Sequence, residues 1–192
     1  MKVPFLILTS ALALAACNKP ADTSAADNAA AMNDMALADD SATANSDAVI
    51  GNGMTAPMAA QSFVNTAAAS DTFEIASAKL AETKATTAAL KTFAAKMVLD
   101  HTDSSVKLKA AAGSMKPDTT LSAKQASDLA TLKGASGADF DAAYKTQQLA
   151  AHTDALALMQ GYAASGDNAD LKGFAGKVAP VVKGHLAMLQ QM

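Results

Sequence analysis

Histidine and glutamate are rare in this chain, so their positions are informative about chemistry. The sequence has only three histidines, His101, His152 and His185, and Glu74 is one of only two glutamates. Imidazole nitrogens and carboxylate oxygens bind zinc, iron and copper ions in proteins. If these four side chains meet, they predict a site for one transition-metal ion: Zn, Fe or Cu.

Helical spacing places the four side chains at similar heights in a bundle. Glu74 and His101 lie equally far from one predicted turn, and His152 and His185 lie equally far from a second. Residues that are symmetric about a tight antiparallel turn sit at equal height. At roughly 1.5 Å per helical residue, the two pairs differ in height by about 5 Å. We therefore expect all four to share one layer of the interior.

The same layer has an explanation without metal. Burying imidazoles and a carboxylate unpaired is costly, so the groups must find partners. A hydrogen-bond network of the histidines with Glu74, extended by Tyr144 and a water molecule, would also satisfy them. A third interpretation is that these side chains face solvent.

Three further polar residues lie near the predicted layer. Asp100, Asp141 and Tyr144 are candidates to hydrogen-bond to the ligands and orient them. For the two aspartates, the alternative is a solvated surface position or a helix cap.

The elements that would carry these residues are helices. Apolar residues recur at three- and four-residue steps over about 62–85, 88–112 and 139–165, and a fourth run follows Asp167, which we predict to be its cap.

The central connector is predicted to contain a shorter helix. Ser122 and Gln125 have the spacing of a capping box, and Gly134 is a suitable terminator.

The two predicted hairpins are similar to one another. The second helix of the first hairpin begins LKTFAAKM (Leu90–Met97). The second helix of the second hairpin begins LKGFAGKV (Leu171–Val178). Two such hairpins joined by a long connector predict an all-α, antiparallel four-helix bundle over residues 61–192, with the short extra helix in its central connector. Chance similarity between Ala-rich helices is the alternative.

The N-terminus has the features of a lipoprotein signal peptide over residues 1–16. Lys2 precedes the apolar run Phe5–Ala16, which is too short to span a bilayer, and Leu14-Ala15-Ala16-Cys17 matches a lipobox. We expect lipidation at Cys17, which is the only cysteine. An ordinary signal peptide followed by a chance cysteine is the alternative.

Residues 17–60 are predicted to be a disordered tether. They are rich in Ala, Asp and Ser and contain no aromatic residue, so they cannot bury enough apolar surface to fold. This organisation predicts a lipid-anchored protein of the cell envelope. Asn18 in place of an aspartate favours the outer membrane, facing the periplasm.

The charge composition argues against nucleic-acid partners. The formal net charge is −3, and all 15 basic residues are lysine. Arginine is the preferred residue for phosphate and base recognition, and no Gly-rich phosphate loop is present. The sequence therefore predicts a membrane attachment through Cys17 and no nucleic-acid partner, and it leaves open which envelope proteins are partners.

Several segments together resemble the bacterial family of domain of unknown function 4142, often labelled "predicted outer membrane protein". The resemblance extends over roughly residues 62–191. It is carried by FEIASAKLA around Glu74, LKTFAAKMVLDH ending at His101, GADFDAAY from Gly137 to Tyr144, His152, and Pro180 to His185.

The resemblance implies a place in the ferritin-like group and hence a four-helix bundle. It also implies that the family pattern includes Glu74, Asp100, His101, Phe140, Asp141, Tyr144, His152 and His185. Ferritin-like di-iron sites use Glu-x-x-His pairs, which this chain lacks, so an oxygen-activating di-iron centre and iron storage are not expected.

We therefore interpret the chain as an envelope lipoprotein that binds a transition metal or small ligand in the core of a four-helix bundle. The alternative is a non-catalytic structural or interaction module whose His/Glu layer is a buried hydrogen-bond network. A metalloenzyme ranks last, because no catalytic residue or substrate pocket is indicated.

Overall fold

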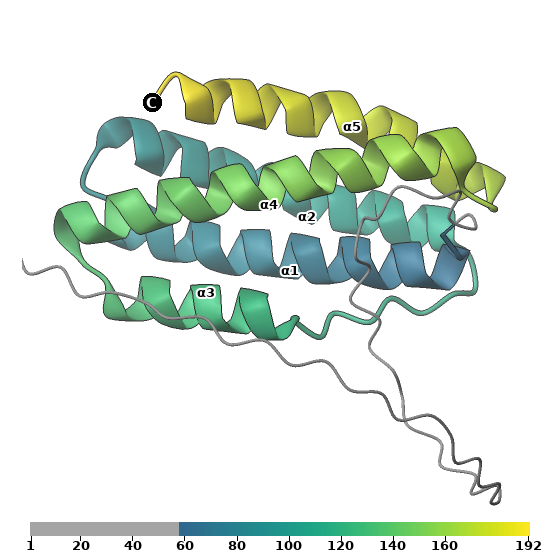
Figure 1. Cartoon of the computed structure of the whole chain (residues 1–192), viewed down its shortest axis with the longest axis horizontal. Helices are drawn as coiled ribbons and strands as arrows, with labels where there is room; N and C mark the ends of the chain where they lie inside the picture. Colours follow the sequence, from purple (N-terminus) through teal and green to yellow (C-terminus); the bar gives the residue numbers. More distant parts are fainter. Residues whose placement is uncertain (1–57) are drawn as a thin grey trace, which may run out of the picture. The chain divides into compact units, whose positions relative to one another are not determined.

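The computed structural model describes residues 58–192 (Figure 1). Helices are the only regular secondary structure in this part of the chain, which confirms the predicted all-α fold. The predicted signal peptide, Cys17 and most of the tether lie outside the described residues. The helices are α1 (Ala60–Lys84), α2 (Ala88–Ala112), α3 (Ala123–Gly134), α4 (Gly137–Ser165) and α5 (Ala169–Gln190).

Within residues 58–192, no helix has both the length and the apolar character needed to cross a membrane.

Side-chain caps begin three of these helices. The Thr87 side chain accepts from the backbone N–H of Leu90 at the start of α2, as Asn168 does from Leu171 at the start of α5. The predicted capping box at α3 is present, with Ser122 bonded to the backbone N–H of Gln125 and the Gln125 side chain bonded to the backbone N–H of Ser122. These bonds satisfy amide groups that have no partner within the helix.

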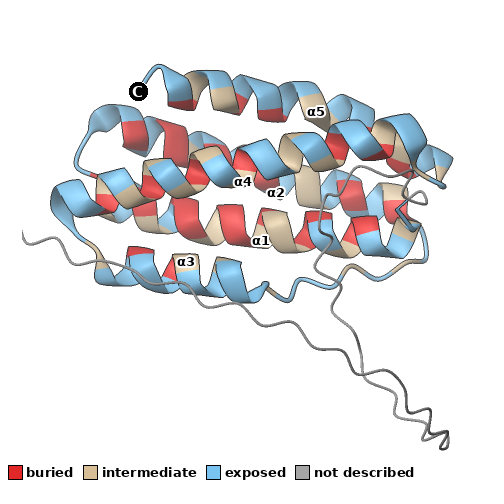
Figure 2. Ribbon diagram, in the orientation of Figure 1, coloured by how far each residue is buried: buried red, intermediate tan, exposed pale blue. Residues whose placement is uncertain are grey.

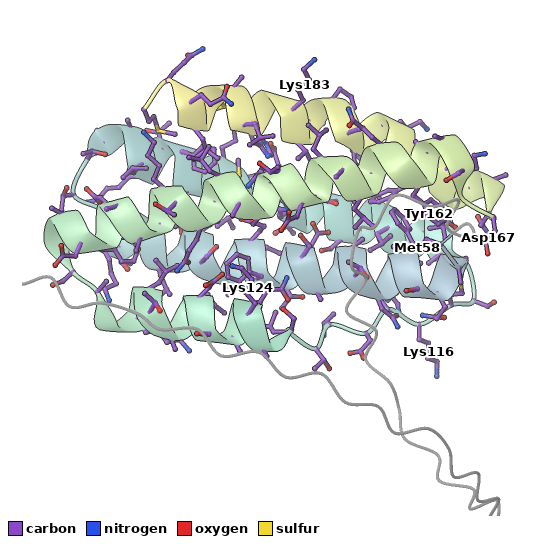
Figure 3. The ribbon with its side chains drawn as sticks, in the orientation of Figure 1. Met58, Lys116, Lys124, Tyr162, Asp167 and Lys183 are labelled. Atoms are coloured by element: carbon purple, nitrogen blue, oxygen red, sulfur yellow. The ribbon has the colours of Figure 1, made fainter. Side chains whose placement is uncertain are left out.

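The predicted cap of α5 was wrong by one residue. Asp167 lies just before Asn168 and accepts instead from the Tyr162 hydroxyl at 2.7 Å and from the backbone N–H of Ala60 at 3.3 Å. Figure 3 shows Tyr162 and Asp167 together at this end of the bundle. The carboxylate therefore joins the α4–α5 turn to the start of α1.

The four long helices form a four-sided bundle. α1 packs against α2 and α4, and α5 packs against α4 and α2. Neighbouring helices run antiparallel (Figure 1). The chain passes from α2 to the diagonally placed α4 through a connector that contains α3, and α3 packs outside the bundle against α1 and α4.

The buried faces point into the bundle (Figure 2) and form two apolar clusters. Near the α4–α5 turn, the Phe63 and Tyr162 rings stack with centroids 3.9 Å apart. Near the α1–α2 turn, the second cluster includes Phe93, Phe140 and Tyr144. Along every long helix, buried polar residues lie between the two clusters: Asp71, Glu74 and Ser77 on α1, His101 on α2, Gln148 and His152 on α4, and His185 on α5.

Candidate metal centre

The three histidines come from three different helices and meet in the polar layer. Their exposed fractions are 7% for His101, 1% for His152 and 2% for His185. The ring centroids are separated by 5.2 to 5.8 Å. One ring nitrogen of each lies within 4.8 Å of the corresponding nitrogens of the other two. Three buried histidines this close together could hold a metal ion.

Asp71 orients the ring of His101. His101 Nδ1 lies 2.8 Å from Asp71 Oδ1, and because a carboxylate only accepts, the ring nitrogen donates. Ser105 Oγ donates to the other carboxylate oxygen at 3.1 Å. In the neutral ring the proton is therefore on Nδ1 and the lone pair is on Nε2. That Nε2 is buried and has no hydrogen-bond partner among the described residues.

The electrostatic environment of His101 favours its charged form. Burial by itself lowers the pKa of His101. The hydrogen bond that His101 donates to Asp71 and the negative charges of Glu74, Asp71 and Asp100 outweigh burial and raise the pKa above its usual value. The same negative charges would stabilise a bound cation.

Asp100 orients His185 in the same manner. His185 Nε2 donates to Asp100 Oδ2 at 2.7 Å, and the same oxygen accepts from Lys96 Nζ at 2.8 Å. Partial burial raises the pKa of Asp100, but Lys96 and His185 outweigh it and lower the pKa below the usual value. Burial, opposed by Asp100, lowers the pKa of His185, so its ring is neutral with the lone pair on Nδ1.

A backbone carbonyl orients His152. His152 Nδ1 donates to the carbonyl oxygen of Gln148, one turn earlier in α4, at 2.9 Å. Burial, followed by the charges of His101 and His185, lowers the pKa of His152 to about 3. The ring is neutral and its lone pair lies on Nε2.

In each histidine, the nitrogen that donates to Asp71, Gln148 or Asp100 is called the outer nitrogen and the other the inner nitrogen. The inner nitrogens of His152 and His185 face one another. His152 Nε2 lies 3.3 Å from His185 Nδ1. With both outer nitrogens donating to oxygen, two neutral rings direct lone pairs at each other, and a cation or a proton between them would remove this repulsion. Two nitrogens bound to one tetrahedral ion at typical zinc distances are roughly 3.3 Å apart. The ligand nitrogens of the three histidines lie within 4.8 Å of one another, so His101 would need to approach by at most about 1.5 Å to complete such a set.

Glu74 lies in the same layer but in a different position from the three histidines. It is 1% exposed, and its Oε1 is 3.7 Å from the outer nitrogen of His152, Nδ1. The group of possible ligand atoms contains the three histidines and does not contain Glu74. Burial, with the charge of Asp71, raises the pKa of Glu74 to about 7, against opposing effects of His101 and Gln148.

Of the predicted orienting residues, Asp100 contacts a histidine and the other two lie elsewhere. Tyr144 is fully buried among aromatic rings, with centroids 6.0 Å from Phe140 and 6.4 Å from Phe93. Burial, reinforced by the charges of Glu74 and Glu82, raises the pKa of its hydroxyl. Its hydroxyl is a buried oxygen without a partner in the described part of the chain.

Asp141 requires a correction, because it does not flank the layer. Its Oδ1 accepts from the backbone N–H of Thr86 at 3.0 Å, and its Oδ2 accepts from the Thr86 hydroxyl. The first turn of α4 packs beside the α1–α2 turn, so position 141 meets that loop and not the histidines. Asp141 therefore joins the two hairpins at one end of the bundle.

Sequence reasoning missed three residues of the layer, Asp71, Ser77 and Gln148. All three are buried, and the Gln148 amide donates to Ser77 Oγ at 3.2 Å. A signal for Asp71 was present, because it lies four residues after Ala67 and three before Glu74 on the same helical stripe. A backbone carbonyl as the partner of His152 has no sequence signal.

Comparison with known proteins identifies a family. The family model described as "Domain of unknown function (DUF4142)" matches residues 47–192, which is most of the chain. No curated protein and no solved structure gives a significant match.

Proposed function

The chain belongs to the DUF4142 family, and because the description of that family names no activity, we propose a function from the site itself: the bundle binds one transition-metal ion through His101, His152 and His185. Neutral imidazoles favour Zn, Cu and Fe over Mg and Ca. The nearby carboxylates of Asp71 and Asp100 supply negative charge for such a cation.

One observation carries the proposal: the outer nitrogen of every histidine is a donor to oxygen. The acceptors are a carboxylate for His101, a backbone carbonyl for His152 and a carboxylate for His185. Metal-binding histidines in proteins are held by this kind of contact, which sets the tautomer and leaves the inner lone pair for the metal. One ring nitrogen of each histidine also lies within 4.8 Å of one nitrogen of each of the other two.

The rival function is a structural hydrogen-bond network. The contacts from Asp71, Gln148 and Asp100 would serve such a network equally well at the outer nitrogens. A network does not account for the inner nitrogens, because His101 Nε2 finds no partner among residues 58–192. A metal satisfies all three inner nitrogens at once.

The test is a metal titration of the full-length protein, purified in mild detergent without a histidine tag and stripped with a chelator. We expect one Zn²⁺, Cu²⁺ or Fe²⁺ per chain by elemental analysis and calorimetry. His101→Ala, His152→Ala and His185→Ala should each weaken binding by more than about 100-fold.

Gln160→Ala, an exposed position on α4, is the matched control and should bind like the wild type. Absence of stoichiometric binding of all three ions, with histidine variants that only unfold more easily, would favour the structural network.

We also propose that the protein is an envelope lipoprotein attached through Cys17. The support is the lipobox Leu14-Ala15-Ala16-Cys17 behind a short apolar run. Labelling of cells with a palmitate analogue should mark the wild type and not Cys17→Ala. Labelling of both proteins, or of neither, would contradict the proposed anchor.

A further inference from the structure

A small cavity lies against two of the three proposed ligands. It has a volume of about 30 Å³ and is bordered by the rings of His101 and His185. A buried space needs roughly 10–15 Å³ by this kind of measure to hold one water molecule. The cavity therefore has room for one or two waters or for one diatomic molecule.

The rest of the cavity wall is mostly apolar. Six aliphatic side chains and two serines line it: Ala67, Ala155, Met159, Val178, Val181, Val182, Ser70 and Ser104. Asp71 and Asp100 also border the cavity, and almost all of its accessible surface is apolar. Negative charge at the wall disfavours an anion, and the aliphatic groups favour a small neutral molecule.

The cavity adjoins a route from the surface. A groove of about 710 Å³ runs along α2 and α5, and Asp100, Ser104, Val178 and Val181 line both the groove and the cavity. Val181 is 45% exposed, so the side chain at this junction reaches solvent. A molecule entering from the groove would pass Val178 and Val181 to reach the cavity beside His101 and His185.

We propose that this cavity holds a small neutral ligand, of one or two non-hydrogen atoms, at the fourth position of the metal, and that the ligand enters through the α2–α5 groove. This inference rests on the proposed metal site and specifies what that site binds. Three protein ligands with an adjacent space are the arrangement of metal sites that accept an external ligand.

The test uses carbon monoxide as the neutral probe on the full-length protein loaded with Cu(I). We expect one copper per chain and a C–O stretching band in the infrared spectrum at one CO per copper. Ala155→Leu extends a side chain into the cavity and should weaken CO binding roughly tenfold or more while the copper content stays unchanged.

The matched control is Ala157→Leu, the same substitution at an exposed position of α4 that does not line the cavity. It should bind CO like the wild type. If Ala155→Leu fails to fold, Ala155→Val gives a smaller intrusion, with a correspondingly smaller loss of CO binding.

The outcomes separate this inference from the metal site itself. If the wild type binds no copper, this inference fails, and the proposed function fails with it only when zinc and iron are not bound either. If copper binds and no CO band appears, only the external ligand is overturned. Equal CO binding by Ala155→Leu and Ala157→Leu would show that the ligand does not use this cavity.

The preference for a neutral ligand has its own test. Azide should bind poorly to the Cu(II)-loaded wild type and several-fold more tightly to Asp100→Asn, which removes a negative charge but keeps an oxygen acceptor for His185. Equal azide binding by both proteins would contradict the charge argument.

Discussion

The two hairpins of the bundle have the same pattern of capping and buried apolar residues but differ in the residues of the polar layer. In the second helix of each hairpin, a capping side chain lies three residues before a buried leucine and six before a buried phenylalanine. These residues are Thr87, Leu90 and Phe93 in α2, and Asn168, Leu171 and Phe174 in α5.

The difference lies in the polar layer. The first hairpin supplies the buried acids Asp71 and Glu74 together with Asp100 and one ligand, His101, whereas the buried polar residues of the second are two histidines and Gln148. The proposed centre therefore forms only where the hairpins pack together. The comparison shows that the shared cap and apolar positions determine how the helices pack. A few polar positions determine which ligands and charges the layer contains.

The largest expected effect comes from removing the ligands of the second hairpin. At a Zn²⁺ concentration of about 1,000 times its Kd, binding should raise the free energy of unfolding of the wild type by about 4 kcal/mol. The double variant His152→Ala, His185→Ala should show no such increase in denaturant titrations. A zinc-dependent increase that survives in the double variant would place the metal elsewhere.

The next effect concerns the buried acid of the first hairpin, Glu74. The pKa of Glu74 in the folded protein, about 7, lies above its usual value of 4.5. This group therefore contributes most to stability below pH 4.5 and loses that contribution as the pH rises towards 7. Glu74→Gln should therefore raise the free energy of unfolding of the metal-free protein at pH 8, by at most about 3 kcal/mol.

The measurement is denaturant unfolding at pH 4.5 and pH 8. The advantage of Glu74→Gln over the wild type should grow between these values, because the glutamine has no proton to lose. Glu82→Gln, at an exposed position of the same helix, is the control. An advantage that is the same at both pH values would contradict the raised pKa.

A smaller effect is expected at Asp71, which orients the ligand of the first hairpin. Asp71→Asn keeps an oxygen for His101 Nδ1 but removes the charge, and should weaken metal binding by roughly 10- to 100-fold. Competition with a chromophoric chelator measures this loss. Asp103→Asn is the control, since Asp103 forms an exposed ion pair with Lys107. Equal affinities for both variants would remove Asp71 from the site.

The smallest effects test the N-caps that the two hairpins share. Thr87→Ala and Asn168→Ala each remove an N-cap and should each lower the free energy of unfolding by about 1 kcal/mol. The two caps lie at opposite ends of the bundle, so their effects should add in the double variant. Metal affinity should not change. A clearly larger loss at one cap would show that the two hairpins are less alike than their sequences indicate.

Most helix boundaries could be predicted from local sequence signals. The predicted helix over 88–112 has the observed bounds, and the capping box of Ser122 and Gln125 is present. α1 and α4 each begin two residues before the predicted start. The common height of His101, His152 and His185 followed from counting residues to each turn, because the rise of a helix is constant.

The contacts of individual polar side chains were harder to predict from the sequence. Position 141 was expected to flank the histidines and instead binds Thr86, and the capping role expected of Asp167 belongs to Asn168. Each error concerns a short polar side chain with several partners within reach. The local pattern does not rank those partners.

The sequence by itself thus determined the helices, their pairing into two hairpins and the height of the histidine layer. Only the tertiary structure decided which nitrogen of each ring points inward, that Asp71 and not Glu74 bonds to His101, and that Glu74 lies at the outer nitrogen of His152. The physical reason is that helical period and rise are local properties of the chain. The rotation of one helix against another, and the choice of rotamer that follows, depend on side chains far away in the sequence.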